Sequence, residues 1–394
     1  MTAEQLLKNL PFASDADILA ATATDKIVTP KALEQYQGKL PHCDDSSIDV
    51  SGLAGNAFSK MLRNYAAEGK IFATPIVSTY DTLLTSSSGA FFGGIMDLNG
   101  DVHFIPSASP VGMKLSAAGV LSTYSLVFTM AAAYAGGVLA PNGDIHFVPT
   151  STTVGQKVDK HGVVSTYTLV YTVAGAYAGG VVAPNGDVHF APGNAAVGQK
   201  ISKEGVVSTY ALIYTASGAH AGAVLALNGD IHFVQRKAPV GQKISAAGVV
   251  STYTLAYTAT DGYYGGVLAP NGDIHFVPRN AAVGQKISKE GVISTYSLLK
   301  TGTNVYACGV LAPNGDIHFV PRNTDVGQKI SIDGVVSTYS LVYTAAEMFI
   351  GGFLDVNGDI HFTPYKGTVI QKVNTASAKP FSRAICCSPF LNKL

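Results

Sequence analysis

The sequence predicts an all-β protein, a seven-bladed β-propeller of 43-residue units with four strands each. The triplet Asn-Gly-Asp occurs seven times, and its Asp recurs at steps of 43, at positions 101, 144, 187, 230, 273, 316 and 359. Each unit contains short segments rich in the β-branched and aromatic residues that strands favour. The last unit lacks its fourth segment, and a matching segment precedes the first unit.

One unit shows how the strands are expected to follow one another. We expect strands over 136–141, 144–149, 154–158 and 163–172, separated by Gly-containing or polar loops. Asn142-Gly143 predicts a two-residue hairpin turn of type I′, in which both residues need positive φ. The early segment at 77–85 is expected to complete the last blade, which would close the ring and leave no long edge. Eight blades are the alternative, because residues 66–75 align with the hairpin.

The repeats divide the chain into three parts. Residues 1–63 are expected to form a helical N-terminal extension with an attachment or capping role, because they contain two short helix-like segments. Residues 64–374 form the predicted propeller, and residues 375–394 form a tail without a clear period.

A polar network is expected inside each blade. Asp144 and His146 share one face of a strand, and Tyr167 of the fourth strand can join them in a hydrogen-bonded cluster. WD40 propellers use similar residue types for this purpose. Seven catalytic or metal-binding pairs are the alternative, but a site needed once has no reason to recur in every unit. We therefore expect no catalytic residue, no metal and no cofactor.

The loops predict which face binds a partner. The Asn-Gly-Asp turns hardly change, whereas the loops from second to third strand and from fourth strand to the next blade vary strongly. These two sets of loops lie on one face of a four-stranded blade, so we expect any ligand there.

Two sets of residues are the binding candidates on this varied face. An aromatic series is expected near the axis: Phe91, Tyr134, Tyr177, His220, Tyr263, Tyr306 and Phe349. Three arginines form a basic sector in consecutive units: Arg236, Arg279 and Arg322. The alternatives are packing between blades for the aromatic residues and simple solvation for the arginines.

Composition narrows the function classes. The formal net charge is zero, which argues against nucleic acid as a partner. The uncharged stretch 120–143 contains Gly and Pro and recurs in pattern, so we expect no membrane insertion. The N-terminus lacks the features of a secretory signal. Enzymatic activity is not expected, because Asp97, Asp355, Asp261 and Glu347 have no companion motif and the first two are interpreted as seam residues.

The strings GGVLAPNGDIHFVP (136–149), VGQKIS (283–288) and GVVSTYSLVYT (334–344) resemble repeats in proteins of tailed bacteriophages. The resemblance implies a non-enzymatic virion protein of the tail, baseplate or host-attachment apparatus. Its partners would be other virion proteins or a host surface receptor or glycan. A glycan-binding propeller and a cytoplasmic protein-interaction scaffold are the alternatives, and the oligomeric state is left open.

Overall fold

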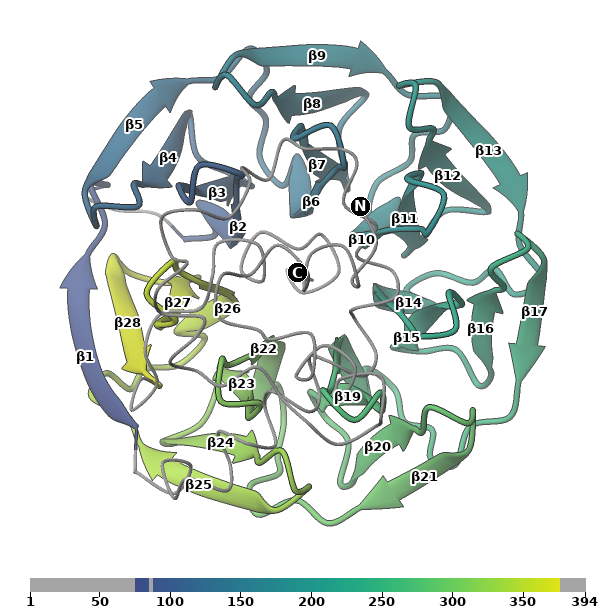
Figure 1. The fold of residues 1–394 in the computed structure, drawn as a ribbon, viewed down its shortest axis with the longest axis vertical. Coiled ribbons are helices and arrows are strands. Elements are labelled where there is room, and N and C mark those ends of the chain that lie inside the picture. The colour runs from purple at the N-terminus through teal and green to yellow at the C-terminus, as the bar shows by residue number, and fades with distance from the viewer. Residues whose placement is uncertain (1–74, 85–87, 376–394) are drawn as a thin grey trace, which may run out of the picture.

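The computed structural model describes residues 75–84 and 88–375, which form seven four-stranded sheets arranged around one axis (Figure 1). The prediction of an all-β, seven-bladed propeller is confirmed. The predicted helical extension over 1–63 lies outside the described residues, as do residues 66–74 of the alternative eighth hairpin and the tail from 376 onward.

Each blade contributes four antiparallel strands from the axis to the rim. The innermost strands are β2 (Phe91–Met96), β6 (Tyr134–Leu139), β10 (Tyr177–Val182), β14 (His220–Leu225), β18 (Tyr263–Leu268), β22 (Tyr306–Leu311) and β26 (Phe349–Leu354). The second strands are β3 (Val102–Pro106), β7 (Ile145–Pro149), β11 (Val188–Pro192), β15 (Ile231–Gln235), β19 (Ile274–Pro278), β23 (Ile317–Pro321) and β27 (Ile360–Pro364).

The outer half of each blade follows the same order. The third strands are β4 (Val111–Leu115), β8 (Val154–Val158), β12 (Val197–Ile201), β16 (Gly241–Ile244), β20 (Gly284–Ile287), β24 (Val326–Ile330) and β28 (Val369–Asn374). The outermost strands are β5 (Leu121–Ser125), β9 (Val164–Thr168), β13 (Val207–Ala211), β17 (Val250–Tyr253), β21 (Ile293–Tyr296), β25 (Val336–Ser340) and β1 (Ile76–Asp81).

The ring closes through β1, as the sequence predicts. This strand pairs antiparallel with β28 from Ile76 opposite Asn374 to Asp81 opposite Val369. The pairing completes a sheet in the order β1-β28-β27-β26, and the two ends of the repeat array lie side by side (Figure 1). The seventh blade therefore contains strands from both ends of the array.

The hairpin turn differs from the predicted type I′ turn. The Gly143 N–H donates to the Ala140 carbonyl at 2.9 Å, and the Ala140 N–H donates to the Asp144 carbonyl at 2.8 Å. Gly143 has φ of 89°, whereas Asn142 is not among the residues with positive φ. The loop therefore has three residues with one left-handed Gly at its end, a form that also matches the twist of the flanking strands.

A Gly on the third strand of a blade packs against a Tyr on the fourth strand. Gly155 of β8 lies opposite Tyr167 of β9, and a Cβ at Gly155 would overlap the Tyr167 ring. The ring therefore lies flat over the glycine and turns its hydroxyl inward toward β7. This packing explains why the third strand carries Gly next to Gln and Lys.

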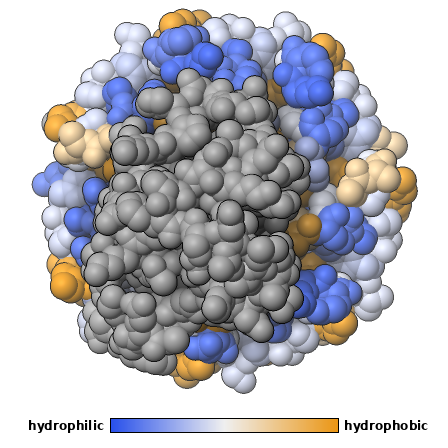
Figure 2. All heavy atoms as spheres, in the orientation of Figure 1, coloured by the Kyte–Doolittle hydropathy of each residue, from blue (hydrophilic) through white to orange (hydrophobic). Residues whose placement is uncertain are grey.

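The hydrophobic core lies between neighbouring blades. One cluster joins Ile95 and Ile105 of the first blade to Tyr134, Ile145 and Phe147 of the second. Similar clusters fill the other junctions, so each blade buries its faces against two neighbours. On the face shown in Figure 2, hydrophilic residues gather in separate groups around the ring, and hydrophobic residues lie at the rim.

Candidate functional site

The repeated His lies inside each blade and contacts the Tyr of the fourth strand. Nδ1 of His146 lies 3.4 Å from the Tyr167 hydroxyl, with the two rings at 73° to each other. The carboxylate of Asp144 accepts instead from Nζ of Lys157 at 2.5 Å. Burial lowers the pKa of His146 to about 4, so this imidazole is neutral at pH 7. The two polar pairs connect the second strand of the blade to the third and the fourth.

The same two pairs recur around the ring. The His–Tyr distances in the other blades lie between 2.7 and 3.3 Å, for His103–Tyr124, His189–Tyr210, His232–Tyr253, His275–Tyr296, His318–Tyr339 and His361–Tyr80. The described residues contain no group of three or more His, Cys, Asp or Glu that could hold a metal ion. This repetition fits a structural role for the network.

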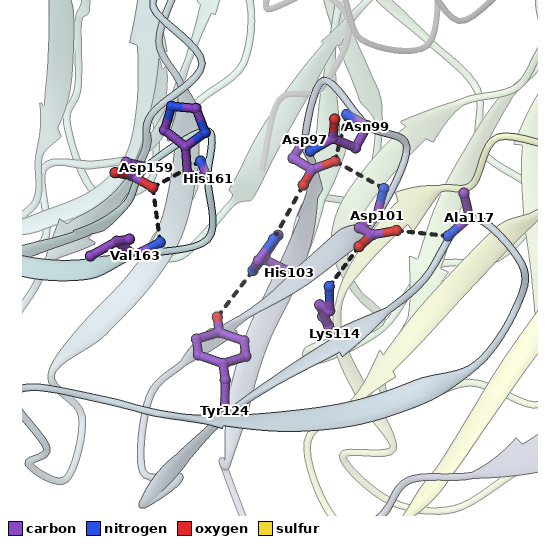
Figure 3. Close-up of polar contacts among 10 residues, drawn as sticks. All are labelled: Asp97, Asn99, Asp101, His103, Lys114, Ala117, Tyr124, Asp159, His161 and Val163. Carbon is purple, nitrogen blue, oxygen red and sulfur yellow. Dashed lines mark hydrogen bonds and ion pairs between the residues drawn. The ribbon is translucent and has the colours of Figure 1, made fainter.

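The two carboxylates at the seam extend this network. Asp97 replaces the usual Ala, and its Oδ1 accepts the N–H groups of Asn99 and Asp101 at 2.8 and 2.9 Å. Its Oδ2 lies 3.5 Å from Nε2 of His103, which produces the chain Asp97–His103–Tyr124 (Figure 3).

Asp355 has the same position in the seventh blade, with Oδ2 at 3.1 Å from Nε2 of His361. Both carboxylates accept N–H groups of their own turns, which gives each a structural task at the seam.

The aromatic series lies in the core and not on the varied face. The tyrosines Tyr134, Tyr177, Tyr263 and Tyr306 are at most 1% exposed, and Phe91, Phe349 and His220 are equally buried. The hydroxyls of Tyr134, Tyr177 and Tyr263 donate to backbone carbonyls at the start of the third strand, and each ring packs on the Phe of the second strand. The expectation that these seven residues line a binding surface is corrected, because no ligand reaches them without repacking of the blades.

The residues that follow this series reach the axis instead. Phe92 of β2 and Tyr264 of β18 belong to blades on opposite sides of the ring, yet their ring centroids lie only 6.4 Å apart. In Figure 1, β2 and the blade of β19 lie across the centre from each other. Both side chains are half-buried, and they lie at the varied end of the innermost strands. Small residues at most equivalent positions leave room for these two rings.

Two of the three arginines lie against Tyr264, and the third lies against another tyrosine. The guanidinium of Arg279 lies over the Tyr264 ring at 4.9 Å from its centroid, and that of Arg236 lies at 5.9 Å. Arg322 lies over Tyr365 at 4.7 Å and is buried. The structure thus brings Arg236 and Arg279 together with Tyr264, a ring that the period alone did not single out and that also contacts Phe92.

Each arginine binds the residue 25 positions later, in the loop that leads to the next blade. Arg236 Nε donates to Asp261 at 2.5 Å, Arg279 Nε donates to Asn304 at 2.6 Å, and Arg322 donates to Glu347 at 3.1 Å. We call these six residues the arginine ladder. Its three acceptors have left-handed backbones, with φ of 53°, 52° and 53°. In the sequence, the only sign of these pairs is that Asp261, Asn304 and Glu347 stand where the other repeats have Gly or Ala.

Comparison with known proteins identifies the fold. No protein-family model and no curated protein matches the chain. Among solved structures, a streptogramin B lyase is 20% identical with a TM-score of 0.68, covering 77% of this chain and 99% of its own. Virginiamycin B lyase from Staphylococcus aureus is 17% identical, with a TM-score of 0.67 over 76% of this chain and 99% of its own.

A third match is the protein YCF48 bound to a D1 peptide. It is 11% identical to this chain, with a TM-score of 0.57 over 77% of this chain and 99% of its own. At these identities the similarity establishes the seven-bladed propeller fold and nothing finer. None of these matches links the chain to virion proteins.

These matches correct the expectation that the protein has no enzymatic activity. Two of the matched propellers are lyases, so the fold of this chain is one that carries enzyme chemistry. The sequence argument against an enzyme relied only on missing companion motifs. Within the described residues, no helix is long and apolar enough to cross a membrane.

Proposed function

We propose that this protein is a ligand-binding propeller whose site lies at the varied end of the axis, over Phe92 and Tyr264. The observation that carries the proposal is the contact of these two rings across the axis, 6.4 Å apart, from blades on opposite sides of the ring. They form a half-buried aromatic floor surrounded by the loops that vary most between repeats. A rigid scaffold that presents variable loops around one patch is typical of binding proteins.

Two matched propellers support a binding role for the fold. One is an inactive virginiamycin B lyase with quinupristin, and the other is YCF48 bound to a D1 peptide.

The test is a ligand-observed NMR screen with aromatic acids, aromatic amides, monosaccharides and short peptides at millimolar concentration. We expect ligands that bind the wild type to lose binding to the F92A/Y264A variant. The matched control is Lys160→Ala, an exposed side chain in a loop at the other end of the blade, which should bind normally. Thermal unfolding of all three proteins checks that each is folded.

Three results contradict the proposal: no ligand for the wild type, unchanged binding to F92A/Y264A, or equal loss in the control. Binding confined to monosaccharides would favour the glycan-binding alternative at this same patch. A place in a virion, with other virion proteins or a host receptor as partners, stays a prediction from the sequence resemblance. Mass spectrometry of purified particles tests it.

A further inference from the structure

The arginine ladder is regular in geometry but irregular in charge. Arg236 and Arg322 face the carboxylates of Asp261 and Glu347, whereas Arg279 between them faces the neutral amide of Asn304. Asn304 supplies the same hydrogen bond from the same left-handed backbone, so the rung keeps its shape without a negative charge. The middle guanidinium is therefore held in place but not neutralised by its ladder partner.

The neighbouring pair of Arg322 and Glu347 adds to this excess of positive charge. Lys366 also contacts Glu347, so two cations share that carboxylate. Counted together, the ladder and Lys366 hold four cations against two carboxylates. Burial and the charges of Arg322 and Arg236 lower the pKa of Arg279, partly offset by Tyr264 and Asp261. Partly desolvated guanidinium groups of this kind favour an anion nearby.

A second observation points to a missing acceptor. Within the described part of the chain, Nε of Arg322 is buried and has no hydrogen-bond partner, and the whole residue is only 7% exposed. A buried donor on a charged group that lacks a partner is costly, and native structures normally satisfy it. An acceptor at the ladder would satisfy donors of this kind.

We propose that the arginine ladder binds the oxyanion of an organic acid, with Arg279 as the main anchor and the apolar body of the ligand on Tyr264 and Phe92. This inference rests on the proposed function and names the ligand class of that site. Guanidinium groups bind carboxylate and phosphate oxygens through paired N–H donors. Tyr264 already lies under Arg279, so one ligand can contact the cation and the ring together.

The alternative role for Arg279 is purely structural, as a tie between two loops through Asn304. The two roles predict different behaviour for Asn304→Asp. That variant keeps the acceptor and supplies the carboxylate that the neighbouring rungs have. If Arg279 is only a structural tie, Asn304→Asp should strengthen its bond to the loop. If Arg279 binds an anion, the new carboxylate neutralises its charge and weakens that binding.

The experiment measures affinity by NMR titration, with benzoate, phenyl phosphate and neutral benzamide as probes. The protein carries fluorotyrosine, and Tyr264→Phe identifies the Tyr264 signal. We expect benzoate or phenyl phosphate to bind the wild type more tightly than benzamide does. Affinity for the anion should fall about tenfold or more in both Asn304→Asp and Arg279→Gln. Asn304→Asp neutralises the guanidinium, and Arg279→Gln removes its charge-assisted hydrogen bond to the ligand. Asp261→Asn, which frees Arg236, should raise it.

The outcomes separate this inference from the proposed function. Equal anion affinity in wild type and Asn304→Asp overturns the anion site, even if Arg279→Gln is destabilised. If benzamide binds at Tyr264 as tightly as benzoate and the ladder variants do not change this, the proposed binding function stands. The inference that the ligand carries an oxyanion is then overturned. A Tyr264 signal that no probe shifts overturns the oxyanion inference, whereas the proposed function is overturned only if the wider screen also finds no ligand. The ratio of benzoate to phenyl phosphate affinity distinguishes a carboxylate from a phosphate ligand.

Discussion

His220 and Gln235 set the fourth blade apart from the other six. They face each other on β14 and β15, where other blades have Tyr or Phe opposite Pro. Both side chains are buried, and in the described structure His220 Nε2 and Gln235 Oε1 have no hydrogen-bond partner. Burial lowers the pKa of His220 to about 4. Each unpaired buried polar group costs about 1–3 kcal/mol.

Restoring the common pair should therefore stabilise the protein. We expect H220Y/Q235P to raise the free energy of unfolding by about 1–3 kcal/mol, since Tyr can donate to a carbonyl as Tyr177 does. Urea unfolding measures the difference. The reverse change in the third blade, Y177H/P192Q, should destabilise. A variant H220Y/Q235P no more stable than the wild type would show that these groups are satisfied in solution.

The buried histidines also predict how stability depends on pH. Burial lowers the pKa of His146, His189, His232 and His275 to about 4 and that of His318 to about 3. Between the unfolded pKa of about 6.5 and these values, the unfolded chain binds protons that the folded chain does not. Stability is therefore full above pH 6.5 and falls as the pH drops toward 4.

Each such histidine contributes a slope of up to about 1.4 kcal/mol per pH unit. Urea unfolding between pH 7 and pH 4.5 measures the total slope. His146→Gln should reduce this slope by up to about 1.4 kcal/mol per pH unit, the value for one proton, and H146Q/H232Q should reduce it by up to about twice that. Stability that stays constant from pH 7 to pH 4.5 would refute this account.

At the scale of elements, a buried Gln of the third strand connects six of the seven blades to the blade before it. Gln199 Oε1 accepts the N–H groups of Val170 and Tyr171 at 2.9 and 2.8 Å. These residues follow β9, which explains why the outer strand ends at Thr168 and not at 172 as predicted. Six of the seven repeats carry this Gln, and the first has Met113, which packs in the seam cluster with Leu84.

Replacing this Gln should loosen one junction. We expect Gln199→Met to cost about 1–3 kcal/mol, because two N–H groups lose their acceptor. Hydrogen exchange should become faster at the amides of Val170 and Tyr171 and should stay unchanged in more distant blades. The seam variant Met113→Leu, a swap of similar volume, should cost less than about 1.5 kcal/mol. Equal protection of both amides in Gln199→Met and wild type would argue against the connection.

At the scale of the whole molecule, β1 determines whether the ring is closed. It covers the edge of β28 and supplies Tyr80, whose hydroxyl lies 2.7 Å from Nδ1 of His361. Val77 of the same strand packs into the cluster of the last two blades. Without β1, the seventh blade would have three strands and an open edge.

Removal of residues 1–81 should therefore lower the thermal midpoint by on the order of 10 °C and cause association that increases with concentration. Removal of residues 1–63 is the matched control, because it keeps β1 and tests the predicted boundary of the extension. Light scattering after size-exclusion chromatography detects the association. A monomeric 1–81 deletion with a normal midpoint would mean that β1 is not needed for closure.

The sequence by itself determined the architecture. The 43-residue period and the Asn-Gly-Asp turns specify pairing between neighbours in the chain, and the early Ser78-Thr79-Tyr80 segment supplies the one strand that the last repeat lacks. Blade number and closure follow from counting these local units. The basic sector could also be read from the sequence, since three arginines occur at steps of 43.

Only the tertiary structure decided which residues meet at the axis. Strand alternation, with an irregular register after Tyr134, buries the aromatic series against the second strand. The next residue then points to the centre, where Phe92 and Tyr264 come together although 172 positions separate them. The repeat period identifies the residues that all blades share, whereas the contacts across the ring depend on residues that differ from blade to blade. For this reason the free charge of Arg279 became visible only when its partner was seen to be Asn304.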